Sequence, residues 1–156
     1  MNMPAMVLLQ ANPIGDVMNN TEWAFPVAEC IHIIFFAVAI GSIAMVDLRL
    51  LGLAFPRSSA AQMVRDTWVY TLVGLTMTVG AGMALFLSDP RMYAFHAWFR
   101  FKAAMLLIAI IYNYTVHSRV AAAGSSKAVA ATVGAVSVLL WATVVLSGVF
   151  VGLVCV

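Results

Sequence analysis

Two residues that can do chemistry interrupt an apolar run early in the chain. Glu29 and His32 lie in the stretch PVAECIHIIFFAVAIG, residues 26–41. Residues three apart share one face of an α-helix, and carboxylate metal sites in helical bundles use Glu-x-x-His at that spacing. We therefore consider His32 a candidate ligand of a haem iron or a metal ion, with Glu29 as co-ligand or as the group that orients the imidazole.

A haem requires a second axial ligand, and the chain offers imidazole and thioether donors for that position. They are His96, His117, Met83 and Met105. His/Met ligation is a known arrangement for haem, and copper accepts the same donors. The cofactors that these residues suggest are haem b or, alternatively, copper. A dinuclear carboxylate site is not indicated, because it would need a second Glu-x-x-His motif and further glutamates.

The other polar residues of the apolar runs fall on two helical stripes. Glu29 and Asp47 are 18 residues apart, which is about five turns, so they share a face. On a later run, Lys102, Asn113 and His117 lie within about 60° of one another. Ionisable residues of this kind face the interior of a bundle or a cavity.

A structural role for these stripes is the alternative to chemistry. Glu29 and Lys102 are expected at a similar depth in the membrane, which predicts that they pair. Asp47 is then expected to pair with His117 or with Arg119. Asn113 and Arg49 belong to the same set of structural polar residues. His32 would in this interpretation be a core histidine with a hydrogen bond from Thr78 or Thr143.

The composition indicates that membrane-spanning helices position these polar residues. Of 156 residues, 64% are hydrophobic and only 9% are charged, against about 25% charged in a soluble domain. The apolar runs, at about 23–47, 67–88, 99–118 and 128–154, each reach the length of about 20 residues that spans a bilayer. We expect one all-α transmembrane domain over residues 1–156, an up-down-up-down four-helix bundle in contact with the lipid bilayer. A short interfacial helix is expected from about Pro13 to Trp23.

The distribution of basic residues predicts the orientation. The connections after the first and third runs carry more Lys and Arg than the opposite side, which has Arg91, Arg100 and Lys102. The positive-inside rule then places both termini outside the inner membrane of a bacterium. Small residues repeat every four positions at Gly74, Thr78 and Gly82, and again at Gly148 and Gly152. Such seams favour close helix packing and admit a homo-oligomer or a larger membrane complex.

Several classes of function are disfavoured. The net charge of +2 is too small to suggest nucleic acid as a partner. Cys30 and Cys155 form no metal or redox spacing. We find no nucleotide-binding loop, no HExxH and no nucleophile elbow, so the chain is not expected to be an enzyme on its own.

Two long stretches carry a resemblance. PIGDVMNNTEWAFPVAECIHIIFFAVAIGSIAMVDLRLLG and GAGMALFLSDPRMYAFHAWFRFKAAMLLIAIIYNYTVH resemble a group of small four-span bacterial membrane proteins classed as a domain of unknown function. The resemblance covers most of the chain and implies a pattern of Trp23, Pro26, Glu29, His32, Asp47 to Arg49, Gly52, Lys102, Asn113 and His117. His96 matches no position of that pattern. The resemblance implies no activity.

Three hypotheses follow from these observations. The leading one is a membrane redox component that binds a b-type haem or a metal through His32. The second is a non-catalytic scaffold or accessory subunit, in which buried polar groups only set the register of the helices. The third is transport of copper or protons along a chain of ionisable residues, namely Glu29, His32, Asp47 and His117.

Overall fold

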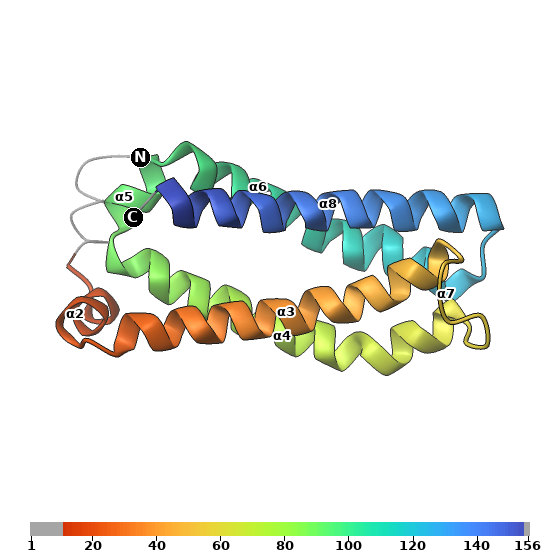
Figure 1. The fold of residues 1–156 in the computed structure, drawn as a ribbon, viewed down its shortest axis with the longest axis horizontal. Coiled ribbons are helices and arrows are strands. Elements are labelled where there is room, and N and C mark those ends of the chain that lie inside the picture. The colour runs from red at the N-terminus through yellow and green to blue at the C-terminus, as the bar shows by residue number, and fades with distance from the viewer. Residues whose placement is uncertain (1–10, 155–156) are drawn as a thin grey trace.

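The computed structural model describes residues 11–154, and within them the chain forms helices and short connections with no strand. Three long helices are continuous: α3 (Ala24–Leu50), α4 (Ala60–Ser88) and α8 (Lys127–Val154). A further long segment consists of α6 (Ala97–Tyr112), the π-helix η1 (Asn113–His117) and α7 (Ser118–Ala123). These four rods lie lengthwise beside one another (Figure 1), which confirms the expected all-α four-helix bundle.

Each of the four rods is long and apolar enough to cross a membrane. Large apolar side chains stay exposed along them, among them Ile33, Leu107, Leu139 and Leu146. A water-soluble bundle would bury such a surface, whereas lipid solvates it. The protein is therefore a multi-pass integral membrane protein that contacts the bilayer.

The helices extend beyond the spans expected from hydropathy. α3 continues to Leu50, α4 begins at Ala60, and the third span continues to Ala123. Capping residues set these limits: the Ser59 hydroxyl accepts a hydrogen bond from Gln62 N at 3.1 Å, and Gly124 ends α7 in the left-handed conformation. Apolar runs show where the chain crosses lipid, but a helix continues through polar residues until a cap stops it.

Two short helices lie at one end of the bundle. α2 (Pro13–Asn20) starts with Pro13 in its first turn, and the Asn12 side chain accepts a hydrogen bond from Gly15 N at 2.7 Å. It ends earlier than the expected Trp23, because Thr21 is extended. α5 (Pro90–Phe95) lies in a segment predicted to be a connection, and it starts at Pro90 after an Asp89 cap.

The bundle consists of two helix pairs. α3 packs most extensively against α4, α6 packs against α8, and α3 also contacts α8. The buried apolar centre, which we call the central cluster, takes residues from all four rods: Ala39, Ile43, Leu75, Ala109, Trp141 and Val144. We call the end that carries α2 and α5 the α2 end, and the end that carries α7 and the α3–α4 connection the α7 end (Figure 1).

Candidate functional site

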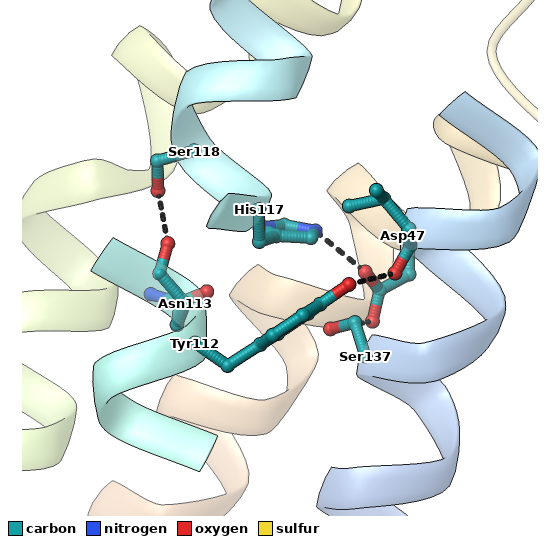
Figure 2. A network of polar contacts seen from close by, with 7 residues as sticks. Asp47, Tyr112, Asn113, His117, Ser118 and Ser137 are labelled. Carbon is teal, nitrogen blue, oxygen red and sulfur yellow. Dashed lines mark hydrogen bonds and ion pairs between the residues drawn. The ribbon is translucent and has the colours of Figure 1, made fainter. Parts of the chain in front are cut away.

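A buried carboxylate joins three rods between the central cluster and the α7 end. Asp47 Oδ1 on α3 accepts a hydrogen bond from His117 Nε2 at 2.6 Å, and Oδ2 accepts one from the Ser137 hydroxyl of α8 at 3.0 Å. The imidazole and the hydroxyl approach the carboxylate from two different helices (Figure 2). Asp47 and His117 are each only 2% exposed. This Asp47 network confirms the expected Asp47–His117 pair, and Arg119 is exposed instead.

The π-helix presents His117 to this network. A π-turn adds about one residue to the helical repeat. The side chains that follow Asn113 therefore point to a different side of the helix than a constant α-helical repeat would give. The Ser118 hydroxyl donates to the Asn113 carbonyl oxygen at 2.7 Å, and the Tyr112 hydroxyl donates to the Val133 carbonyl oxygen of α8 at 3.0 Å (Figure 2). These bonds attach the π-helix both to itself and to α8.

A small cavity borders the same segment. It has a volume of about 30 Å³ and is lined by residues that include Thr67, Thr71, Asn113, His117 and Ser118. A polar cavity needs about 10–15 Å³ of this space to hold one water molecule. The cavity reaches this volume, but much of its lining is apolar, from Ile43, Val46, Val64 and Trp68, and the Nε2 atom of His117 is engaged by Asp47.

The second intramembrane histidine lies on the other side of the central cluster. His32 Nδ1 donates a hydrogen bond to the Thr78 carbonyl oxygen of α4 at 2.8 Å. Because a carbonyl only accepts, the proton is on Nδ1 and Nε2 keeps its lone pair. Nε2 has no hydrogen-bond partner among residues 11–154, and those residues do not seal it off. Metal-binding histidines use this arrangement, in which one ring nitrogen is anchored and the other is free.

The position of the His32 ring depends on a glycine. A Cβ atom at Gly82 of α4 would lie 2.9 Å from His32 Cε1 and 3.0 Å from Nδ1. The Phe36 ring lies nearly parallel to the imidazole, at a centroid distance of 6.3 Å. Together with the Thr78 carbonyl, these neighbours fix the plane of the imidazole. Of the two expected partners, Thr78 does bond to the ring, through its main-chain carbonyl oxygen, whereas the Thr143 hydroxyl donates to the Leu139 carbonyl oxygen of its own helix.

The expected Glu29–Lys102 pair does not form. Glu29 is exposed, and the one ion pair in the described part of the chain is Asp47–His117. Lys102 instead lies along α8, where its Nζ would be 3.4 Å from a Cβ at Gly148. The physical reason is that α6 packs on α8, whereas α3 packs mainly on α4 at this level.

The remaining candidate ligands do not surround His32. Met83 is exposed on α4, Met105 packs against the central cluster, and His96 lies at the start of α6. Residues 11–154 hold no group of three or more His, Cys, Asp or Glu side chains that would enclose a metal ion. Cys30 is a free, exposed thiol, and Cys155 lies outside the described residues. The described structure therefore offers one imidazole nitrogen without a hydrogen-bond partner, Nε2 of His32, and no further protein ligands grouped around it.

The central cluster separates the two histidines on every rod. Ala39 and Ile43 lie between His32 and Asp47 on α3, and Ala109 lies between Lys102 and Asn113. On α4, Leu75 separates Thr78 from Thr71, and on α8 the same layer contains Trp141 and Val144. The polar residues therefore form two sites, which we call the His32 site and the Asp47 network.

Sequence reasoning missed three contributors, Ser137, Tyr112 and Gly82. A serine in the apolar run of α8 gives a weak signal, since many such serines bond to their own helix, as Ser147 does to Val144. Gly82 was recognised as part of a packing seam, but its contact with His32 was not. Arg49, expected as a structural polar residue, donates to the Ser58 carbonyl oxygen and closes the α3–α4 connection.

No model of a known protein family, no curated protein and no solved structure matches this chain. The resemblance to four-span bacterial proteins of unknown function stays a prediction.

Proposed function

We propose that this protein is a membrane redox component that binds one haem b through His32. The observation that supports it is the hydrogen bond from His32 Nδ1 to the Thr78 carbonyl oxygen at 2.8 Å, with Nε2 left unpartnered among the described residues. Haem iron is commonly held by a histidine nitrogen. A hydrogen bond on the other ring nitrogen orients the imidazole and increases its basicity as a ligand.

The neighbours of His32 suit this role. The ring is held by a backbone carbonyl, which cannot rotate away, and Gly82 leaves space for the ring against α4. The apolar surroundings exclude water from the bound group, and burial is one of the means by which a protein sets the potential of a haem. Bound haem would supply one-electron chemistry, and the chain would supply the ligand, its orientation and the dry environment.

We propose His32 as the one protein ligand of the iron, so the second axial ligand expected from the sequence is not part of the proposal. His117 Nε2 is bound to Asp47, and Met105 is packed into the central cluster. Met83, another expected candidate, is exposed on α4, and His96 forms neither a hydrogen bond nor a ring contact with His32 in the described structure. Copper is the alternative occupant, since it also binds imidazole.

A scaffold role is supported for the Asp47 network, which lies toward the α7 end of the bundle. The Asp47 network connects α3, η1 and α8 through side chains that are nearly fully buried. Transport along Glu29, His32, Asp47 and His117 is less well supported, because the apolar central cluster interrupts that path. We place the protein in the inner membrane of a bacterium, with the α2 end outside and the basic connections at the α7 end inside. A homo-oligomer or a larger membrane complex is compatible with the exposed apolar surface.

The test is the haem and copper content of the purified protein. The protein is produced with haem supplied, purified in a neutral detergent, and assayed by the pyridine haemochrome method and by elemental analysis. We expect about one haem per chain, and nearly none in His32→Ala. His96→Ala is the matched control, because His96 lies at the start of α6 and forms no hydrogen bond or ring contact with His32 in the described structure.

Equal haem content in the wild type and in His32→Ala would contradict the proposal. Stoichiometric copper without haem, lost in His32→Ala, would instead identify the alternative occupant. A folded wild-type protein that contains neither would leave the scaffold role as the function of the whole chain.

A further inference from the structure

A lysine lies inside the third span without a counter-ion in the described part of the chain. Lys102 is half-buried on α6, and no carboxylate of residues 11–154 is within ion-pair distance of its ammonium group. No hydrogen bond to its Nζ is formed by those residues either. A cation inside a membrane is costly, by about 2.5–3.5 kcal/mol on insertion scales, and such residues usually have a partner.

The surroundings of Lys102 leave its ammonium group at the level of His32. Its aliphatic stem and Nζ lie over Gly148 of α8, where the missing side chain provides the space. His32 lies against Gly82 of α4 and Lys102 against Gly148 of α8, and each glycine is six residues from the α2-end terminus of its helix. Both residues lie between the central cluster and the α2 end. A ligand bound to His32 would therefore come close to an unpaired positive charge.

We propose that Lys102 binds a carboxylate of the ligand held by His32, namely a propionate of haem b. This inference rests on the proposed function. Haem b carries two propionate carboxylates, and an ammonium–carboxylate hydrogen bond is about twice as strong as a neutral one. The anion would neutralise a charge that the chain itself leaves unpaired. The ligand would also bridge the two helix pairs, with iron on α3 and a carboxylate on α6.

An anionic lipid is the other source of a negatively charged oxygen at this position. A lipid phosphate would pair with Lys102 from the α2-end interface and would not involve His32. The two sources share the same chemistry, so the experiment must separate them. Glu29 is not a substitute, since it is exposed and outside ion-pair distance.

The experiment compares haem b with its dimethyl ester, in which both carboxylates are neutralised. Apoprotein in a neutral detergent is titrated with each compound, and the Soret band gives the dissociation constant. We expect the wild type to bind haem b about tenfold or more tightly than the ester. In Lys102→Met the two compounds should bind equally. Lys127→Met is the matched control, because Lys127 is exposed at the opposite end of the bundle.

The comparison of the two compounds in the wild type needs no variant, so the inference can be tested even if Lys102→Met does not fold. Equal affinity for haem b and its ester in the wild type, with a His32-dependent Soret band, would overturn the role of Lys102 and leave the proposed function standing. No Soret band with either compound would overturn the proposed function itself.

A lipid arm decides between the two anions. The wild type is reconstituted in nanodiscs of phosphatidylcholine alone or with phosphatidylglycerol, and the two titrations are repeated. An unchanged preference for haem b supports the propionate. Loss of the wild-type preference when phosphatidylglycerol is present would assign Lys102 to a lipid phosphate and overturn the inference.

Discussion

The two histidines inside the membrane differ in what their ring nitrogens contact. His117 Nε2 donates to the Asp47 carboxylate, so its bundle-facing nitrogen is occupied. His32 uses Nδ1 on a main-chain carbonyl and leaves Nε2 with a lone pair. Each neutral imidazole keeps one nitrogen with a lone pair, so the two histidines differ in access: His117 is only 2% exposed beside the Asp47 carboxylate, whereas His32 is partly exposed. This difference supports the proposed ligand role of His32 and a structural role for His117.

Gly82→Ala should displace His32. The new Cβ would lie 2.9 Å from His32 Cε1, so the imidazole must move off its bond to the Thr78 carbonyl. We expect haem content to fall several-fold, measured as the ratio of Soret to protein absorbance. Gly80→Ala is the control on the same helix, since a Cβ there meets nothing within 4 Å. An equal loss of haem in both variants would contradict the proposed contact between Gly82 and the His32 ring.

Asp47→Ala should destabilise the bundle more than any change at the His32 site. It leaves His117 and Ser137 buried without their acceptor, and breaking a buried charged pair costs about 3–5 kcal/mol in soluble proteins. Ser137→Ala removes one hydrogen bond and should cost about 1 kcal/mol. The free energy of unfolding is measured by titration of detergent micelles with sodium dodecyl sulfate.

Ser147→Ala is the matched control for Ser137. Both serines are buried on α8, but the Ser147 hydroxyl bonds to Val144 of its own helix. Its replacement should therefore change the free energy of unfolding by less than that of Ser137. Similar values for both serines would show that the hydrogen bond between α8 and Asp47 contributes nothing.

Among the elements, the α3–α4 pair is the one on which the His32 site depends. α3 carries the imidazole, and α4 supplies both the Thr78 carbonyl and Gly82. The main chains of the two helices come close at Gly74, where a Cβ would be 2.9 Å from the Ala39 nitrogen and from the Phe35 carbonyl oxygen. The small-residue repeat that the sequence shows on α4 is thus a packing seam against α3.

Gly74→Ala should separate these two helices. The obstructing atoms belong to the main chain of α3 and cannot rotate away, and overpacking of this kind costs about 1–3 kcal/mol. We expect a lower free energy of unfolding and a weaker affinity for haem in the same variant. Gly80→Ala again serves as the control. An unchanged free energy of unfolding in Gly74→Ala would mean that the helices are not in contact there.

The π-helix is the element that sequence reasoning could not provide. The stripe of Lys102, Asn113 and His117 was placed with one constant helical repeat, yet the chain winds differently from Asn113 to His117. The pairing of Asp47 with His117 was still predicted correctly, because the prediction used only the similar depth of the two residues in the membrane. The Glu29–Lys102 pair also matched in depth but failed, because depth does not reveal which helices pack together.

For the molecule as a whole, hydropathy was sufficient for the number of spans and their approximate positions. Every rod contains one of the expected apolar runs, and the ends differ only where caps and polar residues extend the helices. The division into two helix pairs, and with it the separation of the two polar sites, depends on side-chain fit. Gly74 against Ala39 and Lys102 against Gly148 are examples of contacts that no periodicity reveals.

The orientation of the molecule can be tested by cysteine labelling. In a variant with Cys30 and Cys155 changed to serine, single cysteines are introduced at Met92 near the α2 end and at Ser126 near the α7 end. The positive-inside rule predicts that a membrane-impermeant maleimide labels position 92 in intact spheroplasts. Position 126 should react only after lysis. The reverse pattern would place the α7 end outside.

The most direct test of the central claim is the reduced-minus-oxidised absorption spectrum of the purified protein. Wild type and His32→Ala are compared after production with supplied haem, with folding checked by circular dichroism. We predict a Soret band in the wild type that shifts on reduction with dithionite and is absent in His32→Ala. A flat spectrum from folded, haem-supplied wild type, or an identical band in both proteins, would contradict the assignment of His32 as a haem ligand.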